Sequence, residues 1–327
     1  MNRTPRTILA VIAAALLALA IAACGGDDEG EEETASPTEA TGALIEEDPA
    51  NQGKSITIGS KNFTEQFVLG NIYAQALEAA GFDVSTELNL GSEQVAFRAL
   101  QSGQIDAYPE YTGTALTSFF GFDTDEVPTD ADAEEAYELA REEYAKEGIT
   151  APAQAPFNNT YILTSTAETA EELGNPQTTT ELTEAEGADE LAIAGFPECR
   201  QRTDCLLGLE DVYSYKPEFV STESQYEALE GGEADLLFGF GTDGALSTDQ
   251  YYTYEDDKEL FRSYRITLSM RDETAEEIGP EGIEIVESVQ EPMTEEVMRE
   301  LNARVDLDKE KPEDVATQYL QEEGFIE

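Results

Sequence analysis

The chain has 327 residues, of which 71 are acidic and 18 are basic, so its formal net charge at pH 7 is −53. A protein this acidic is not expected to bind nucleic acid, because phosphate needs cationic partners. The sequence contains no histidine, which excludes Ser-His-Asp triads, imidazole bases and histidine-ligated metals. We therefore expect neither a metal nor a cofactor. We attribute the acidity to a surface adapted to high salt rather than to attraction of cationic ligands.

The N-terminus has the pattern of a secretory signal. Arg3 and Arg6 precede an apolar run over residues 8–20, which is shorter than the ~20 apolar residues that a membrane span needs. Small residues then lead to Cys24, as in a bacterial lipobox. We predict a signal peptide over residues 1–23, removed before Cys24, whose sulfur then carries the lipid that anchors the protein outside the cell membrane. The alternative is an ordinary signal peptide that contains a cysteine by chance.

The segment after the cysteine, residues 24–54, is acidic and free of aromatic side chains. It cannot bury enough apolar surface to offset the entropy lost on ordering. We predict a disordered tether here.

The rest of the chain alternates between strand-like and helix-like patterns. In chain order we expect elements at residues 55–59 (strand), 64–80 (helix), 84–90 (strand), 92–100 (helix), 105–108 (strand), 129–148 (helix), 161–164, 191–195 and 218–221 (strands), a helix ending at 229, 234–240 and 265–270 (strands), and a helical tail over 294–323. Gly81 is placed to end the first helix, and Pro312 suits a helix start. The alternation indicates an α/β architecture with a parallel sheet.

One pattern occurs twice. Residues 99–106 and 228–235 both read as a helix end, a glycine and the start of a strand, and each is followed by an aromatic residue beside Thr and Gly, at 111–114 and 240–243. Ligands of open α/β sheets lie beyond the carboxyl ends of strands. We expect two lobes that each offer one aromatic side chain to a shared cleft; chance similarity of two common βα units is the alternative.

Two motifs carry a family resemblance. Residues 59–66 read Gly-Ser-Lys-Asn-Phe-Thr-Glu-Gln, and residues 106–114 read Asp-Ala-Tyr-Pro-Glu-Tyr-Thr-Gly-Thr. Together they resemble the substrate-binding proteins of osmoprotectant ABC importers, which bind glycine betaine and related quaternary amines. The resemblance implies an α/β, two-lobed periplasmic binding protein-like fold of type 2, with the ligand cleft between the lobes. Lobe 1 would span residues 55–157, lobe 2 residues 158–262, and residues 263–327 would return to lobe 1.

The same resemblance implies an aromatic cage. It places Tyr111, Tyr161, Phe240 and Tyr264 around the ligand, with Asn159 in support. A quaternary ammonium has no N–H to donate, so aromatic faces recognise it, each worth about 0.5–1 kcal/mol when exposed and ~2 when desolvated. Family members commonly have tyrosine where this chain has Phe240, so the π face is kept and a hydroxyl is lost.

A betaine also carries a carboxylate. The resemblance assigns its recognition to Lys61, at the start of a helix, to Thr114, and to Arg202 in the clamp loop over residues 197–205, with Glu198 in support. The alternatives are a solvated surface position for Lys61 and an ion pair of Arg202 with Glu198 or Asp204.

Cys199 and Cys205 flank this loop and are the cysteines left after Cys24. Outside the cytoplasm two such thiols usually pair, so we expect a disulfide rather than a thiolate enzyme or a metal site.

We conclude from the sequence that the chain is a lipid-anchored, monomeric and non-enzymatic receptor that binds a small quaternary amine and delivers it to an ABC permease. A receptor for choline or an amino acid on the same fold is the first alternative. A carboxylate-based extracytoplasmic hydrolase is the second, although no spacing singles out a carboxylate pair. Without histidine, we expect ligand affinity to stay nearly constant from about pH 6 to 8.

Overall fold

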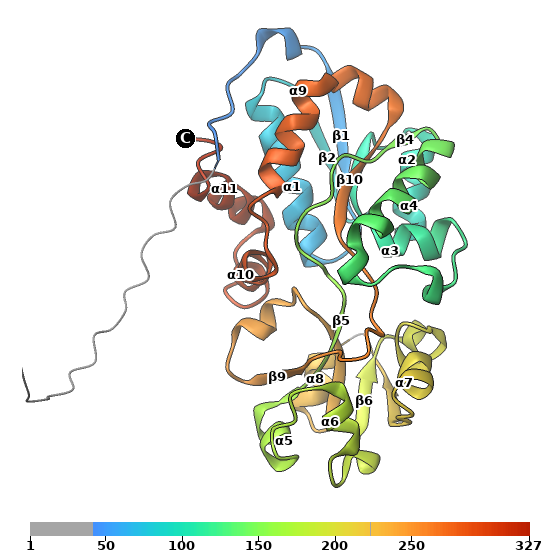
Figure 1. Ribbon diagram of the computed structural model, residues 1–327. Coiled ribbons are helices and arrows are strands. Elements are labelled where there is room, and N and C mark those ends of the chain that lie inside the picture. The colour runs from blue at the N-terminus through green and yellow to red at the C-terminus, as the bar shows by residue number, and fades with distance from the viewer. Residues whose placement is uncertain (1–41, 223) are drawn as a thin grey trace, which may run out of the picture. The chain divides into compact units, whose positions relative to one another are not determined.

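A computed structural model describes residues 42–222 and 224–327 (Figure 1). The predicted signal peptide, Cys24 and most of the predicted tether lie outside these residues. No helix in the described part of the chain is long and apolar enough to cross a membrane.

The described residues form two mixed five-stranded sheets, each in its own lobe. The first sheet has the order β2-β1-β3-β10-β4, and its strands are β1 (Ser55–Gly59), β2 (Asp83–Glu87), β3 (Ala107–Tyr111), β4 (Ile149–Thr150) and β10 (Ile266–Arg271). The second has the order β7-β6-β8-β5-β9, and its strands are β5 (Tyr161–Thr166), β6 (Ala192–Gly195), β7 (Glu218–Ser221), β8 (Leu236–Phe240) and β9 (Tyr251–Tyr254).

Helices flank both sheets (Figure 1). Their bounds are α1 (Thr64–Ala79), α2 (Glu93–Ser102), α3 (Thr112–Thr114), α4 (Ala133–Lys146), α5 (Ala167–Glu172), α6 (Thr179–Glu184), α7 (Leu206–Val212), α8 (Gln225–Glu230), α9 (Asp272–Gln290), α10 (Glu295–Asp306) and α11 (Pro312–Glu322). Short helical turns are η1 (Pro49–Asn51), η2 (Ala115–Phe119), η3 (Thr124–Glu126), η4 (Asp130–Asp132), η5 (Ala188–Glu190), η6 (Pro197–Gln201) and η7 (Gly244–Ser247). As expected, Pro312 opens α11, and Gly81, at φ 93°, follows the end of α1.

The sheets are mixed rather than parallel as the sequence suggested. β1 pairs in parallel with β2 and β3, but β10 runs antiparallel to β3 and β4. The second sheet repeats this arrangement, with β5 antiparallel to β8 and β9. The reason is that β5 and β10 are the strands on which the chain enters one lobe and returns to the other, so they are not built by βα crossovers.

The internal repeat of the sequence corresponds to equivalent positions in the two sheets. β3 follows α2 and β8 follows α8, and each strand lies third in its sheet, between a parallel and an antiparallel neighbour. Gly103 and Gly232, with φ of 72° and 69°, occupy the left-handed conformation that lets the chain leave the helix. Tyr111 and Phe240 are therefore the last residues of matching strands.

Strand β3 extends farther than expected and contains Pro109. Its bonds to β10 join the Thr112 N–H to the Arg265 carbonyl and the Arg271 N–H to the Asp106 carbonyl. In this register the nitrogen of residue 109 faces away from β10, toward β1, and pairing with β1 is limited to Ala107. The proline therefore removes no donor that the sheet needs, and the strand continues to Tyr111.

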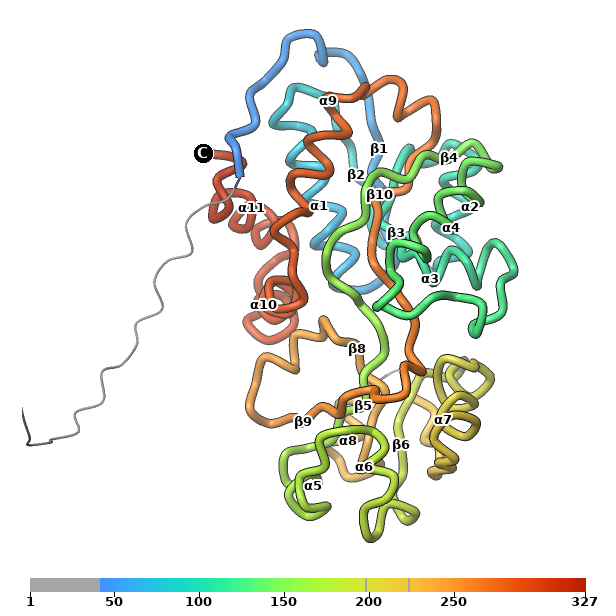
Figure 2. The backbone as a smooth tube through the Cα atoms, in the orientation of Figure 1, coloured from blue at the N-terminus to red at the C-terminus, as the bar shows by residue number. Residues whose placement is uncertain are grey.

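The folded part also begins earlier than the sequence suggested. The backbone N–H groups of Gly42 and Ile45 donate to the carbonyls of Glu323 and Phe325, at 2.8 and 2.9 Å. Ile45 packs against the same core that buries Phe325. This contact holds residues 42–54, placed by the sequence in the tether, on lobe 1. Figure 2 shows the start of this blue segment beside the C-terminus.

Candidate functional site

The site begins where β1 and β3 end, at the same edge of the first sheet. Lys61 is 5% exposed, and its Nζ forms an ion pair with the fully buried Glu110. The ammonium also lies 4.3 Å from the ring centroid of Tyr111 and 5.8 Å from that of Phe63. Lys61 is thus not the solvated surface cation that the sequence left open. It is a buried cation with one partner already in place.

Tyr111 is held from two sides. Its hydroxyl donates to Oε1 of Glu65 at 2.6 Å, and its ring stacks with that of Phe63 at a centroid distance of 6.3 Å. Burial and the adjacent Glu65 carboxylate raise the pKa of Tyr111 well above its usual value. The phenol therefore stays protonated and acts as a fixed donor, while Lys61 lies over the ring.

A second aromatic group lies at the end of β8 in the other lobe. Tyr161 and Phe240 are paired in register across β5 and β8, and their rings stack at 4.9 Å with an interplanar angle of 25°. Phe196 extends this group, with its ring 6.0 Å from that of Phe240. At 4.9 Å there is no room for a methylated ammonium between the rings. Tyr161 and Phe240 therefore form one double-layered wall, not two opposite walls.

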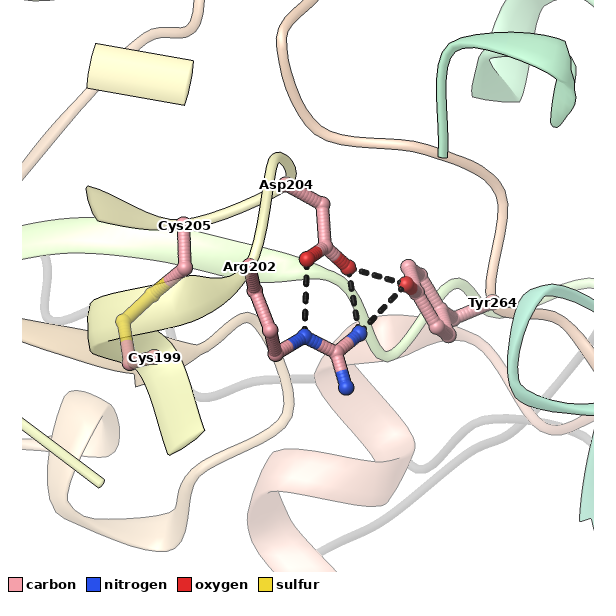
Figure 3. Close-up of a disulfide and its surroundings, with 5 residues drawn as sticks. All are labelled: Cys199, Arg202, Asp204, Cys205 and Tyr264. Atoms are coloured by element: carbon pink, nitrogen blue, oxygen red, sulfur yellow. Dashed lines mark hydrogen bonds and ion pairs between the residues drawn. A yellow bond between two sulfur atoms is a disulfide. The ribbon is translucent and has the colours of Figure 1, made fainter. Parts of the chain in front are cut away.

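Arg202 lies beside this wall and is bound by Asp204 (Figure 3). Its Nε donates to Oδ1 of Asp204 at 2.7 Å and its Nη2 to the hydroxyl of Tyr264 at 3.0 Å, and a further ion pair joins Nη2 to Asp204. Tyr264 in turn donates to Asp204. Burial lowers the pKa of Arg202, but the bonds and charge of Asp204 outweigh it and raise that pKa above its usual range.

The ion-pair alternative for Arg202 therefore holds with Asp204, yet it leaves part of the guanidinium available. Both bonds to Asp204 use one edge, and in Figure 3 the remaining nitrogen, Nη1, points away from that carboxylate. Among the described side chains Nη1 has no hydrogen-bond partner. The Arg202 side chain is 31% exposed, so Nη1 can still donate to a ligand carboxylate.

The clamp loop is closed by a disulfide between Cys199 and Cys205 (Figure 3). The two Cα atoms are 5.3 Å apart and both cysteines are fully buried. Arg202 lies inside this short ring, which limits the backbone positions it can reach. The side chain of Glu198 is outside the described part, so its supporting role stays a prediction.

The segments between the lobes contact Tyr111 and the turn that follows it. Asn159 donates to Oε1 of Glu65 at 2.8 Å and to the Tyr111 hydroxyl at 3.4 Å. A Cβ added at Gly113 would lie 2.9 Å from Cε1 of Tyr264, so the glycine permits this ring to approach the turn after Tyr111. Within the described residues, no ring contact joins Tyr111 directly to the other three predicted cage residues. Thr114, half-buried in α3, follows the same turn.

Sequence reasoning missed several participants. Glu65 and Phe63 stand inside the first motif, and Phe196 precedes the clamp loop, but their roles depend on partners far along the chain. Glu110, the partner of Lys61, is 49 positions away. The presence of acidic and aromatic residues within the two motifs was the only available signal.

Asp243 contributes a titrating group near the lobe contact. Its carboxylate accepts from the Phe240 N–H and the Tyr226 hydroxyl, both at 2.8 Å. Burial raises the pKa of Asp243 to about 6, with these bonds opposing the shift and the charges of Glu65 and Asp306 adding to it. The sequence predicted no change from pH 6 to 8, and Asp243 adds a titration at the lower end of that range.

Replacing Asp243 with asparagine is expected to flatten the pH dependence of stability between pH 4 and 6. In this range the native protein holds a proton that the unfolded chain, with an ordinary pKa of 3.8, has released. The free energy of unfolding of the wild type therefore falls by on the order of 3 kcal/mol as the pH rises from about 4 to about 6 through this group, and the contribution is constant above. Urea titrations at fixed salt would measure it, and equal slopes for both proteins would contradict the assignment.

The residues described hold no cluster of three or more acidic or cysteine side chains placed to bind a metal ion. What they do hold is a set of aromatic faces that includes the last residues of β3 and β8, one partly free guanidinium in the clamp loop and one buried ammonium after β1. The family model for the substrate-binding domain of ABC-type glycine betaine transport systems matches residues 54–322. The chain belongs to this family.

Relatives of this substrate-binding family cover nearly the same length. The glycine-betaine-binding protein of Pseudomonas aeruginosa is 30% identical over 289 residues, which is 84% of this chain and 90% of the relative. The glycine betaine-binding protein YehZ of Escherichia coli is 26% identical over 296 residues, covering 85% and 93%. In structure, the chain is similar to a glycine betaine/carnitine/choline ABC transporter protein with a TM-score of 0.70 at 22% identity, covering 81% of this chain and 97% of the other. The two-lobed fold expected from the sequence is confirmed.

Proposed function

We propose that this substrate-binding protein is a receptor for glycine betaine or a closely related zwitterionic quaternary amine, which it delivers to an ABC importer. The observation that supports it most is the placement of Arg202, with Nη1 turned away from Asp204, beside the ring wall of Tyr161 and Phe240. Such a site offers a cation for a carboxylate and π faces for a methylated ammonium a few ångströms apart, which matches the two ends of a betaine.

In this proposal Tyr111 and Tyr264 complete the cage from the lobe 1 side. The Tyr161–Phe240 stack forms the wall of lobe 2. Asn159 supports Tyr111 through its hydroxyl.

The carboxylate would be bound chiefly by Arg202, with Thr114 as a hydroxyl donor. Lys61 would assist, since an ammonium has three N–H donors and Glu110 occupies one of them among the described partners. Glu198 would support the loop.

Calorimetry with glycine betaine, proline betaine, choline, carnitine and ectoine tests the proposal. We expect micromolar binding, about 8 kcal/mol, for a ligand that combines a quaternary ammonium with a carboxylate, and weaker binding of choline, which lacks the carboxylate. Choline bound as tightly as glycine betaine would instead indicate a choline receptor. No binding of any of the five would reject the proposal.

We further propose that the receptor acts outside the cell membrane, anchored by lipid on Cys24. Replacing Cys24 with serine is expected to release the secreted protein from the membrane fraction without changing its ligand affinity, because the site lies entirely in residues that follow. Fractionation with an antibody against the folded domain measures the release. Retention of the variant in the membrane fraction would count against lipidation.

A further inference from the structure

Glu65 bonds to three separate segments of the chain, although its own helix, α1, needs none of these bonds. It lies in the first turn of that helix and is 3% exposed. Its Oε1 accepts from the Tyr111 hydroxyl at 2.6 Å and from Nδ2 of Asn159 at 2.8 Å, and its Oε2 accepts from Nδ2 of Asn302 at 3.1 Å. None of these three donors is a cation, and no described cation forms an ion pair with Glu65.

The three donors come from three different segments. Tyr111 ends β3, Asn159 belongs to the crossover into lobe 2, and Asn302 lies on α10. Because a carboxylate only accepts hydrogen bonds, it fixes the direction of all three donors at once. It makes the phenol of Tyr111 point toward α1, and it orients the side-chain amide of Asn302.

The second hydrogen of Asn302 reaches lobe 2. Nδ2 donates to the carbonyl of Thr242 at 2.8 Å, in the loop that follows β8. Arg299, one turn earlier on α10, donates to the carbonyl of Gly241 in the same loop. A Cβ added at Gly244 would lie 2.5 Å from the backbone nitrogen of Ala303, so the loop and α10 meet backbone to backbone.

These contacts form one continuous path between the end of β3 in lobe 1 and the loop after β8 in lobe 2. It runs from Tyr111 through Glu65 and Asn302 to Thr242, which is two residues beyond Phe240. The path thus starts at one aromatic residue of the proposed cage, Tyr111, and ends in the loop that follows another, Phe240. If Asn302 were reversed, its amide oxygen would face the Glu65 carboxylate, so the orientation that holds Thr242 depends on Glu65.

We propose that Glu65 is a positioning residue that couples the orientation of Tyr111 to the contact between α10 and the loop after β8. This inference rests on the proposed function, since it assigns Glu65 a part in ligand affinity without contact to the ligand. The coupling acts through the Tyr111 hydroxyl on one side and the Asn302 amide on the other.

A double-mutant cycle tests the first half of the path. Glu65→Gln places an amide where a carboxylate accepted, and Tyr111→Phe keeps the π face while removing the donor. We expect each change to weaken glycine betaine binding about 5–10-fold in calorimetry, and the double variant to lose little more than either one. The reason is that both act on the same bond: Tyr111→Phe removes its donor, and Glu65→Gln replaces its charged acceptor with a neutral one. A loss in the double variant equal to the product of the single losses would overturn the proposal, as would wild-type affinity in Glu65→Gln.

The matched control is Glu138→Gln, which makes the same chemical change at an exposed carboxylate paired with Arg141. It is expected to keep wild-type affinity. If Glu65→Gln fails to fold, Asn302→Ala replaces it in the cycle, since it removes the link to lobe 2 without placing a new group at position 65.

Hydrogen exchange of the ligand-free protein tests the second half of the path, from Glu65 through Asn302 to Thr242. In Glu65→Gln, the amides of residues 241–244 should exchange several-fold faster than in the wild type, although they belong to the other lobe, while the amides of α4 should not change. Unchanged exchange at residues 241–244 would overturn the coupling. This measurement also separates the two proposals: a wild type that binds none of the five ligands would reject the proposed function, whereas the exchange rates would still decide whether Glu65 couples the lobes.

Discussion

Replacing Tyr111 with alanine is expected to reduce the affinity for glycine betaine by about 30-fold or more. The change removes an aromatic face worth ~2 kcal/mol in a desolvated site, and it also removes the donor that Glu65 accepts. Lys61, which lies 4.3 Å from the centroid of the Tyr111 ring, loses its nearer aromatic neighbour at the same time. Calorimetry against the same ligand panel measures the loss.

Phe240→Tyr is the matched control for this prediction. It keeps the ring that stacks on Tyr161 and adds a hydroxyl, so we expect affinity close to that of the wild type. Thermal unfolding of both variants separates a lost contact from a lost fold, because Tyr111 is only 4% exposed. Wild-type affinity in a folded Tyr111→Ala variant would show that Tyr111 is not part of the cage, and would contradict this part of the proposed function.

The same variant bears on the motion of the lobes. Tyr111 belongs to lobe 1 and Phe240 to lobe 2, so a ligand that needs both stabilises the arrangement in which the lobes approach. Small-angle scattering should show the wild type becoming more compact with glycine betaine. We expect no such change in Tyr111→Ala at the same ligand concentration.

Replacing Arg202 with alanine is expected to weaken glycine betaine about 10–150-fold and choline far less. A charge-assisted hydrogen bond of this kind is worth roughly 1.5–3 kcal/mol. Only glycine betaine has a carboxylate that can accept this bond, so choline has nothing to lose. The side chain also lies beside Tyr161, with its guanidinium carbon 5.8 Å from the ring centroid. Removing this packing can lower the affinity for both ligands by a small and equal factor. The test is therefore the ratio of the affinity loss for glycine betaine to that for choline.

Arg200→Ala provides the matched control, since it removes the same charge from the same loop. The guanidinium of Arg200 lies over the ring of Phe219 instead of the cage, so both affinities should stay at their wild-type values. Equal losses for glycine betaine and choline in Arg202→Ala would show that Arg202 is a structural partner of Asp204 and not a ligand clamp.

The sequence predicted the bounds of individual strands and helices well where the hydrophobic residues followed one clear period. Strands β1 and β7 have the expected bounds, and the helix from Thr64 ends one residue before the predicted end. The mixed order of the sheets was missed because antiparallel return strands have the same local pattern as parallel ones. Strand β3 was predicted too short because a proline usually ends a strand. Pro109 does not end it, since the register with β10 points the proline nitrogen away from that strand.

The sequence named residues for the proposed site, but it did not reveal most of their bonding partners. The motifs pointed to Tyr111, Lys61 and Arg202, and the structure places each of them at the ends of β1 and β3 or beside the ring wall of lobe 2. The bonds that set their chemistry could not be predicted, because they join distant segments. Asn302 reaches Glu65 across 237 positions of the chain, and nothing in either local sequence signals that meeting.

The attachment of residues 42–54 to lobe 1 has a consequence for the proposed lipid anchor. If Cys24 carries the lipid, the anchor is joined to the molecule through lobe 1, where Gly42 is held beside the end of α11. Lobe 1 would then be the anchored lobe and lobe 2 the lobe that moves when ligand binds. A permease would accordingly detect bound ligand from the position of lobe 2 relative to the anchored lobe 1.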